Sequence, residues 1–144
     1  MHNSKDLSGL NNPDQDNAEI LCIGTELLLG NIVNSNARWI AEQLSIIGLS
    51  HYQQIVAGDN IPRLQKIILD AKERSRFLIT TGGLGPTPDD LTTEAIASTF
   101  NTPLQQREGL WEEIENKIRN DGKKPSAINK KQTFFPANAM IIQN

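Results

Sequence analysis

Apolar residues along this chain follow two alternating periods. Short apolar runs of the β type occupy residues 19–23, 49–56 and 76–81, and between and after them apolar residues recur every three or four positions. This second spacing predicts helices, because a helix that packs on a sheet shows an apolar stripe of this kind. The predicted helices cover residues 35–47, 61–75, 92–100 and 107–120. Strands that alternate with helices predict an α/β fold with βαβ units, a parallel sheet and right-handed crossovers.

The two ends of the chain have a different pattern. Residues 1–17 are rich in Asn, Asp, Ser and Gly and have no apolar period, which is typical of a disordered leader. Near the other end, residues 123–132 are polar, and the apolar residues 139–142 predict a final strand. One domain over residues 18–144 is therefore expected.

Composition agrees with a globular domain and narrows the expected partners. Hydrophobic residues make up 38% and charged residues 22% of the 144 residues. The net charge of −3 argues against a nucleic-acid partner, because binding to a phosphate backbone requires clustered Lys and Arg. The short basic pairs at 123–124 and 130–131 are interpreted as solvated surface. No run reaches the roughly 20 apolar residues of a membrane span, and no signal-peptide pattern opens the chain. We therefore expect no membrane partner and a cytoplasmic location.

The loop after the third predicted strand carries the strongest chemical signal. Residues 81–92 read TGGLGPTPDDLT, with three glycines, two prolines and the adjacent acids Asp89 and Asp90. Small residues let backbone NH groups approach a phosphate, and acids at the end of the loop can serve a metal ion or a reacting oxygen. Two alternatives stay open. The glycines can be simple turn formers, and Asp90 can be a cap on the helix that follows it.

Two other loops leave the carboxyl ends of predicted strands, which is the edge where open α/β sheets bind ligands. Residues 24–30 read GTELLLG and residues 57–60 read AGDN, so each loop contains glycine and an acid. Topology therefore predicts that acids from all three loops lie at one edge of the sheet, although Asp59, or Asn60 after it, can equally cap the next helix. The four acids are Glu26, Asp59, Asp89 and Asp90.

Several common catalytic patterns are missing from the sequence. It contains no GxSxG elbow, no P-loop lysine motif and no GxGxxG fingerprint. His2 falls in the expected leader and His51 in a predicted strand, so a histidine mechanism or a histidine metal site has little support. The single Cys22 excludes an internal disulfide and lies within an apolar run, where a buried small hydrophobe is expected.

Three segments together resemble a known family. They are GTELLLGNIVNSNA at 24–37, VAGDN at 56–60 and TTGGLGPTPDDLTTEA at 80–95. In order and spacing they are similar to the N-terminal domain of CinA-type competence/damage-inducible proteins. That domain belongs to the molybdopterin-binding superfamily, with the MoaB, MogA and MoeA proteins. The resemblance implies a three-layer α/β/α sandwich with a mostly parallel sheet. It also implies a phosphorylated pterin or nucleotide-like ligand and a homo-oligomer.

The same resemblance implies roles for individual residues. Cofactor-making relatives have an Arg-Asp pair after their glycine motif, whereas here Asp89 takes the Arg position and Asp90 the Asp position. This change removes a phosphate-pairing cation and adds a possible metal ligand. It favours the CinA pattern, a pyrophosphatase that acts on ADP-ribose with a divalent metal such as Mg²⁺, Mn²⁺ or Co²⁺. The implied catalytic residues are Asp90 and Asp59, the implied metal ligands are Asp89, Asp90 and Glu26, and the implied phosphate- or ligand-binding residues are Gly24, Thr25, Gly82, Gly83, Gly85 and Thr87.

Three functions stay open from the sequence. The leading hypothesis is metal-dependent hydrolysis of a nucleotide-sugar pyrophosphate such as ADP-ribose. The alternatives are a non-catalytic pterin or nucleotide-binding module, or a protein of the molybdenum cofactor biosynthesis type, and a scaffold that acts only through assembly. The family domain continues past the position that matches Asn144, and CinA-type proteins carry a second, amidohydrolase-like domain. The resemblance therefore implies a domain that is incomplete at its C-terminus.

Overall fold

The centre of the structure, a computed structural model that describes residues 17–142, is a parallel sheet of three strands. These are β1 (Asn17–Ile23), β2 (Ser50–Ala57) and β3 (Phe77–Thr81), in the order β2-β1-β3. All three predicted strands are confirmed. The first begins at Asn17, two residues earlier than expected, and the rest of the predicted leader lies outside the described residues.

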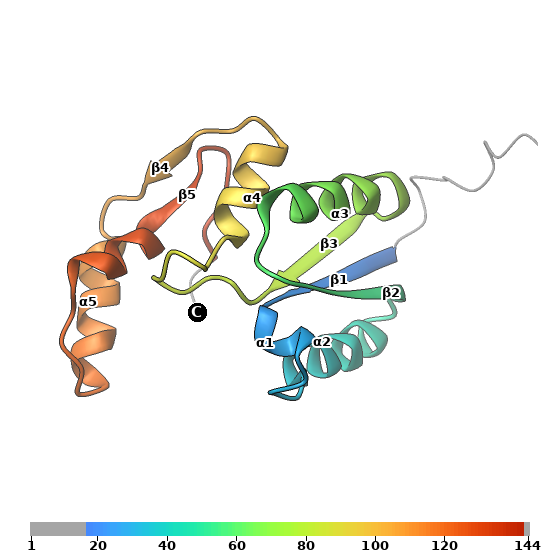
Figure 1. Ribbon diagram of the computed structural model, residues 1–144, viewed down its shortest axis with the longest axis horizontal. Helices are drawn as coiled ribbons and strands as arrows, with labels where there is room; N and C mark the ends of the chain where they lie inside the picture. The colour runs from blue at the N-terminus through green and yellow to red at the C-terminus, as the bar shows by residue number, and fades with distance from the viewer. Residues whose placement is uncertain (1–16, 143–144) are drawn as a thin grey trace, which may run out of the picture.

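Helices cover both faces of this sheet (Figure 1). Helix α2 (Ser35–Ile46) lies on one face, and α3 (Ile61–Arg74) and α4 (Thr92–Thr99) lie on the other. Asn34 and Asn60 cap α2 and α3, because their side-chain oxygens accept hydrogen bonds from backbone amides in the first helical turns. The predicted three-layer α/β/α architecture is therefore confirmed.

Strand β1 supplies the middle of both hydrophobic cores. Successive side chains on a strand point to opposite faces, so Leu21 and Ile23 join the core under α3 and α4. Ile20 and Cys22 join the core under α2. Cys22 is fully buried, which confirms its prediction as a small core residue.

The buried strand also contains one acid, Glu19. Its side chain is only 4% exposed and accepts hydrogen bonds from Arg74 at 3.0 and 2.8 Å and from the Ser75 hydroxyl at 2.7 Å. Burial acts to raise the pKa of Glu19, but the hydrogen bonds from Arg74 and Ser75 and the Arg74 charge outweigh burial and lower it. This ion pair ties the end of α3 to the central strand.

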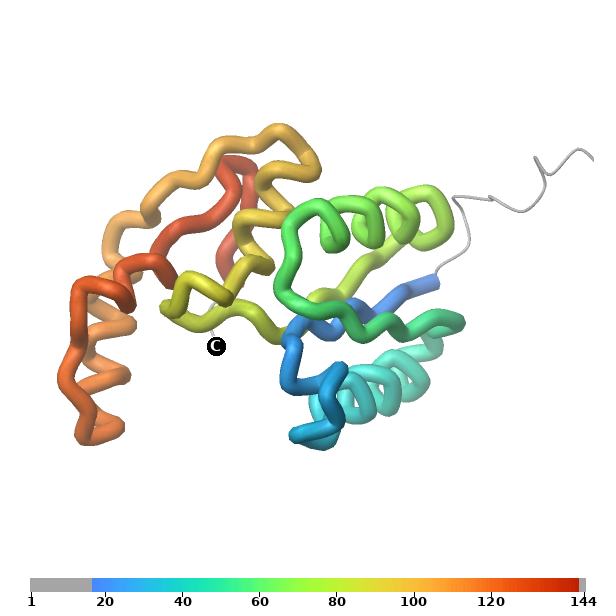
Figure 2. Tube along the Cα trace, in the orientation of Figure 1, coloured from blue at the N-terminus to red at the C-terminus, as the bar shows by residue number. Residues whose placement is uncertain are grey.

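A smaller lobe follows α4 in the chain. Its strands β4 (Leu104–Gln106) and β5 (Phe134–Pro136) pair antiparallel. Between them lie α5 (Leu110–Asn120) and the 3-10 helix η1 (Ala127–Thr133). Figure 2 shows the C-terminal part of the chain turning back toward the loop that follows β3. None of the helices within residues 17–142 is long and apolar enough to cross a membrane.

Two predictions for this lobe are wrong in detail. The helix predicted from 107 begins at Leu110, because Gly109 adopts a left-handed conformation (φ 79°) and the Arg107 amide bonds instead to the carbonyl of Thr133. Residues 139–142 are irregular and do not form the predicted strand. The Arg107 guanidinium donates instead to the carbonyls of Pro136, Ala137 and Ala139, just before and at the start of this segment, at 2.9–3.2 Å.

The structure also contains short elements that periodicity did not predict. Helix α1 (Thr25–Leu28) has four residues and lies within the first loop of the predicted site. β4 and β5 have three residues each, too few to show a period.

Candidate functional site

The carboxyl ends of β1 and β3 form a topological switch point. These strands are neighbours in the sheet, yet the chain leaves β1 toward α2 on one face and leaves β3 toward α4 on the other (Figure 1). Such divergence opens a crevice at the end of an open α/β sheet, where ligands bind. The Gly-rich loop and the GTELLLG loop flank this crevice.

Glycine is required at the start of the Gly-rich loop. Gly82 has φ 88°, and a Cβ added there would lie 2.0 Å from the carbonyl oxygen of Ile23. Gly83 has φ 60°, and its added Cβ would lie 2.4 Å from the hydroxyl of Thr92, which donates to the Gly82 carbonyl at 2.6 Å. The glycines thus provide both positive φ angles and close approach of the loop to the end of β1.

The first two loops are joined by Thr25 and Asp59. The Asp59 carboxylate accepts hydrogen bonds from the Thr25 amide at 3.1 Å and from its hydroxyl at 3.0 Å. Asn60, and not Asp59, caps α3. The alternative interpretation of Asp59 as a cap is therefore wrong, and this acid instead fixes the loop that contains Gly24 and Glu26.

Asp90 folds back onto its own loop. Its Oδ2 accepts hydrogen bonds from the Thr87 amide at 2.8 Å and the Thr87 hydroxyl at 2.6 Å. A Cβ on Gly85 would lie 2.5 Å from the same oxygen, so the carboxylate needs a glycine beneath it. Leu91 is at the N-cap of α4 and no side chain caps that helix. Asp90 is therefore not a helix cap.

Several groups act on the ionisation of Asp90. Partial burial acts to raise its pKa, but hydrogen bonds from Thr87 and the Gly85 amide, together with the charge of Lys131, outweigh burial and lower it. Asp90 is consequently ionised at neutral pH. Its carboxylate is held as an oriented anion.

Lys131 is the main site residue that sequence reasoning missed. Its Nζ donates to the carbonyl of Thr87 at 2.8 Å and to the carbonyl of Asp90, and it lies 3.1 Å from Glu94 Oε1. The interpretation of this residue as solvated surface is wrong, because only 27% of its side chain is exposed. A lysine pair in a polar stretch gives no local signal for contacts 41 and 44 positions away.

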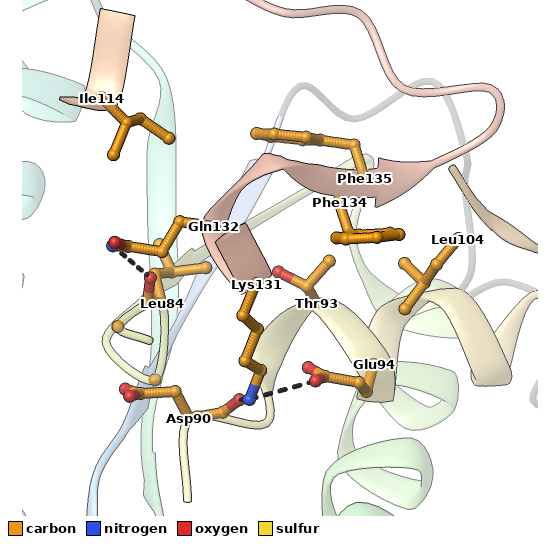
Figure 3. A pocket seen from close by; sticks show the side chains of 12 residues that line it. Leu84, Asp90, Thr93, Glu94, Leu104, Ile114, Lys131, Gln132, Phe134 and Phe135 are labelled. Carbon is orange, nitrogen blue, oxygen red and sulfur yellow. Dashed lines mark hydrogen bonds and ion pairs between the residues drawn. The ribbon is translucent and has the colours of Figure 1, made fainter. Parts of the chain in front are cut away.

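The acid-bearing loop borders a cavity of about 330 Å³ (Figure 3). Gly83, Gly85 and Asp90 line it from the loop, and Lys131 and Phe134 line it from the C-terminal lobe. The side chain of Gln132 holds the two together by donating to the Leu84 carbonyl at 3.3 Å. The cavity is therefore formed jointly by the loop and a segment more than 40 residues later.

A second, smaller cavity of about 130 Å³ lies at the switch point itself. Glu26, Asn36, Thr81 and Gly82 are among its lining residues. The Asn36 amide donates to the Thr81 hydroxyl at 3.1 Å and links α2 to the end of β3. The first and third loops therefore meet here, as predicted.

The four predicted acids share the sheet edge but have separate surroundings. Asp59 bonds to Thr25, Glu26 lines the smaller cavity, Asp90 lines the larger one, and Asp89 is exposed and lines neither. Among residues 17–142, no three His, Cys, Asp or Glu side chains form a group that could hold a metal ion. The donor set does not fit a cation held by protein alone. It fits one held by one or two carboxylates and by substrate phosphates, an arrangement common for Mg²⁺.

The switch-point sheet, the Gly-rich loop and the adjoining cavity are the features of an α/β domain with its site at the carboxyl ends of the strands. Residues 19–142 match the family described as "Probable molybdopterin binding domain". The chain belongs to this family.

Individual relatives agree with the membership. A CinA-like protein of Prochlorococcus marinus (strain MIT 9313) is 60% identical over 126 residues, which cover 88% of this chain and 29% of that protein. The crystal structure of the protein CinA from Thermoplasma acidophilum superposes with a TM-score of 0.78 and 28% identity, over 90% of this chain and 75% of that one. The molybdopterin biosynthesis Mog protein of Mycobacterium ulcerans matches with a TM-score of 0.52 and 30% identity, over 57% and 54% of the two chains. The resemblance to CinA-type proteins is thereby confirmed.

Proposed function

We propose that this domain binds a nucleotide-sugar pyrophosphate such as ADP-ribose and hydrolyses it with the help of a divalent cation, Mg²⁺, Mn²⁺ or Co²⁺. The observation that carries the proposal is the Asp89-Asp90 pair. Asp90 is a fixed anion at the edge of the 330 Å³ cavity, and Asp89 beside it is exposed. Family membership supports a phosphorylated ligand at this edge of the sheet.

The loop residues would bind and orient the pyrophosphate. The start of α4 has no side-chain cap, and the Thr92 amide already donates to the Gly83 carbonyl at 3.2 Å, so the Thr93 and Glu94 amides of the first turn are the ones that can donate to an anion. Gly83 and Gly85 keep side chains away from this path, and Gly24 and Thr25 present the first loop from the other side of the crevice. Thr87 keeps the Asp90 carboxylate in one orientation.

Asp90 suits a positioning role better than proton removal. A general base works best with a pKa near the operating pH, whereas the pKa of Asp90 is lowered. It would orient the attacking water, with Asp59 fixing the first loop. Asp89, Asp90 and Glu26 are the residues that would hold the cation, which would supply charge neutralisation on the phosphates and activation of water.

The proposal is tested by incubating the protein with ADP-ribose and each cation and measuring AMP. Asp90→Asn should reduce the rate at least about 100-fold, since removal of a positioned acid-base or charge-stabilising group has effects of this size. Asp70→Asn is the matched control, because Asp70 is an exposed acid on α3. Absence of AMP from the wild type, or equal rates for both variants, would refute the proposal.

A second candidate function is a non-catalytic module for a pterin or nucleotide, or a protein of the molybdenum cofactor biosynthesis type. Two observations favour it: the structural match to the Mog protein and the separate surroundings of the four acids. Thermal-shift measurements separate the candidates. A ligand at 100 times its Kd stabilises a fold by about 2.7 kcal/mol, so stabilisation by ADP-ribose or a pterin without turnover would support binding alone.

A further inference from the structure

Lys131 lies at the Gly-rich loop, yet its ammonium group has no donor left for a ligand. An ammonium carries three N–H donors and no acceptor. The acceptors around Nζ are the carbonyl of Thr87 at 2.8 Å, the carbonyl of Asp90, and Glu94 Oε1 at 3.1 Å. We propose that Lys131 is a positioning residue, which orients the Asp90 carboxylate through the backbone of the acid turn, residues 87–90. The inference rests on the proposed function in one respect, because it takes Asp90 as an acid that acts on the ligand.

The acid turn is closed by two reciprocal hydrogen bonds. The Asp90 amide donates to the Thr87 carbonyl at 3.1 Å, and the Thr87 amide donates to Asp90 Oδ2 at 2.8 Å. Pro88 occupies the second position of this turn, where its fixed φ angle favours a turn. The backbone of the acid turn and the direction of the Asp90 carboxylate therefore depend on each other.

Lys131 binds both ends of the acid turn. Its Nζ joins the carbonyls of Thr87 and Asp90, and Glu94 in the first turn of α4 holds the same ammonium. Figure 3 shows the Asp90 carboxylate directed away from the ammonium, whose hydrogen bond is to the Asp90 carbonyl. Lys131 thus acts on the backbone of Asp90 and does not occupy the carboxylate, which borders the larger cavity.

The alternative is that Lys131 only ties the C-terminal lobe to the loop. The neighbouring Gln132 makes such a tie, since its amide donates to the Leu84 carbonyl at 3.3 Å, outside the acid turn. Lys131 allows the two roles to be separated, because all three of its acceptors belong to the loop and to α4. A free ammonium compound can therefore replace its hydrogen bonds without joining the lobe to the loop.

Chemical rescue of Lys131→Ala tests the inference. This substitution removes the atoms of propylammonium, so added propylammonium should restore the acid turn. Tetramethylammonium has the charge but no N–H donor and should not restore it. The first measurement needs no ligand and follows hydrogen exchange of the Thr87 and Asp90 amides by NMR. Exchange should be at least about tenfold faster in Lys131→Ala and return toward the wild-type rate in propylammonium.

The second measurement is AMP formation from ADP-ribose with Mg²⁺ or Mn²⁺. Misplacement of a catalytic group by about 1 Å can lower a rate about 100-fold. The kcat of Lys131→Ala should therefore fall at least about tenfold with little change in KM, and propylammonium should raise it again. Lys131→Arg keeps N–H donors and should lose less activity. Wild type in the same amine controls for any effect of the amine on ADP-ribose.

The neighbouring residues provide matched controls. Lys130→Ala makes the same change at an exposed lysine whose Nζ lies 5.5 Å from the centre of the Trp111 ring, so exchange and kcat should stay at the wild-type values. Gln132→Met removes the hydrogen bond to Leu84 and should leave exchange of the Thr87 and Asp90 amides unchanged. Circular dichroism of each variant verifies the fold.

Several results would overturn the positioning role. They are wild-type exchange in Lys131→Ala, equally fast exchange in Gln132→Met, no response to propylammonium, and an equal response to tetramethylammonium. A wild-type kcat in Lys131→Ala despite faster exchange would overturn it as well. If the wild type forms no AMP, the hydrolase is refuted, and the exchange and rescue measurements still decide whether Lys131 orients Asp90.

Discussion

Gly82→Ala should destabilise this domain much more than alanine at other glycines with a similar backbone. Gly82 and Gly48 both have positive φ angles, 88° and 74°. The left-handed conformation destabilises an alanine by about 1–2 kcal/mol at either position. An added Cβ at Gly48 meets no atom within 4 Å, whereas at Gly82 it would lie 2.0 Å from the Ile23 carbonyl oxygen. Gly48→Ala therefore isolates the backbone contribution.

The difference in the free energy of unfolding between Gly82→Ala and Gly48→Ala measures the cost of the steric clash at Gly82. Ordinary contact begins at 3.4 Å, so the Gly82 loop and β1 would have to separate by about 1.4 Å (3.4 − 2.0). Overpacking of this kind destabilises proteins by about 1–3 kcal/mol, which gives a total of about 2–5 kcal/mol for Gly82→Ala. The Ile23 backbone belongs to the central strand and cannot move cheaply.

Urea unfolding followed by circular dichroism tests this reasoning. With a slope of about 1.5 kcal/mol per molar, a difference of about 2 kcal/mol separates the two midpoints by about 1.3 M urea. Equal midpoints for Gly82→Ala and Gly48→Ala would show that the loop is free to move away from β1. The short distance between Gly82 and the Ile23 carbonyl would then contribute nothing to the free energy of unfolding.

Other predictions address the ion pair, the acid loop and assembly. Glu19→Gln should destabilise the fold by about 2 kcal/mol in urea, because it removes a charged partner from Arg74. The lowered pKa of Asp90 means that its carboxylate stabilises the fold above its ordinary pKa of about 3.9, and that this contribution is lost as pH falls through the lower native pKa. The urea midpoint of wild type should thus fall more between pH 7 and 3 than that of Asp90→Asn. Lys131→Met should lower the thermal midpoint by about 6–10 °C, with partial recovery in Lys131→Arg, since it removes two hydrogen bonds of about 1 kcal/mol each and each kcal/mol shifts the midpoint by about 3–5 °C. A homo-oligomer is predicted, and sedimentation of a clean monomer would contradict it.

The main body of the fold was predictable because its pattern is local. The apolar spacing of Ala37, Ile40 and Leu44 predicts α2, and the continuous apolar run within β1 predicts the central strand. Asn60 at the start of α3 followed from ordinary capping preferences. Each of these signals lies within a few residues of the element it predicts.

The C-terminal lobe was less predictable because distant contacts determine it. Apolar residues 139–142 satisfy a strand pattern, but the Ala139 carbonyl accepts from Arg107 and no strand forms. Phe134–Pro136 forms a strand only because Leu104–Gln106 lies beside it.

In the candidate site, too, the features set by topology were predictable and those set by distant contacts were not. Topology correctly placed three loops at one edge of the sheet, and Thr25 and Asp59 meet there. The position of Asp90 on Thr87 was not expected, since a carboxylate before a helix usually serves as its cap. Lys131 could not be found from its neighbours, because its partners lie on the loop and on α4.

Lys131 and Gln132 bond to the Gly-rich loop, so binding of the proposed ligand would be thermodynamically linked to docking of the C-terminal lobe. A ligand in the shared cavity would touch both parts and so would favour the docked arrangement by its binding free energy. Saturation should therefore slow hydrogen exchange at the amides of η1 and β5 as well as in the loop. Substitutions that loosen the lobe will appear as losses of affinity, even where no altered side chain contacts the ligand.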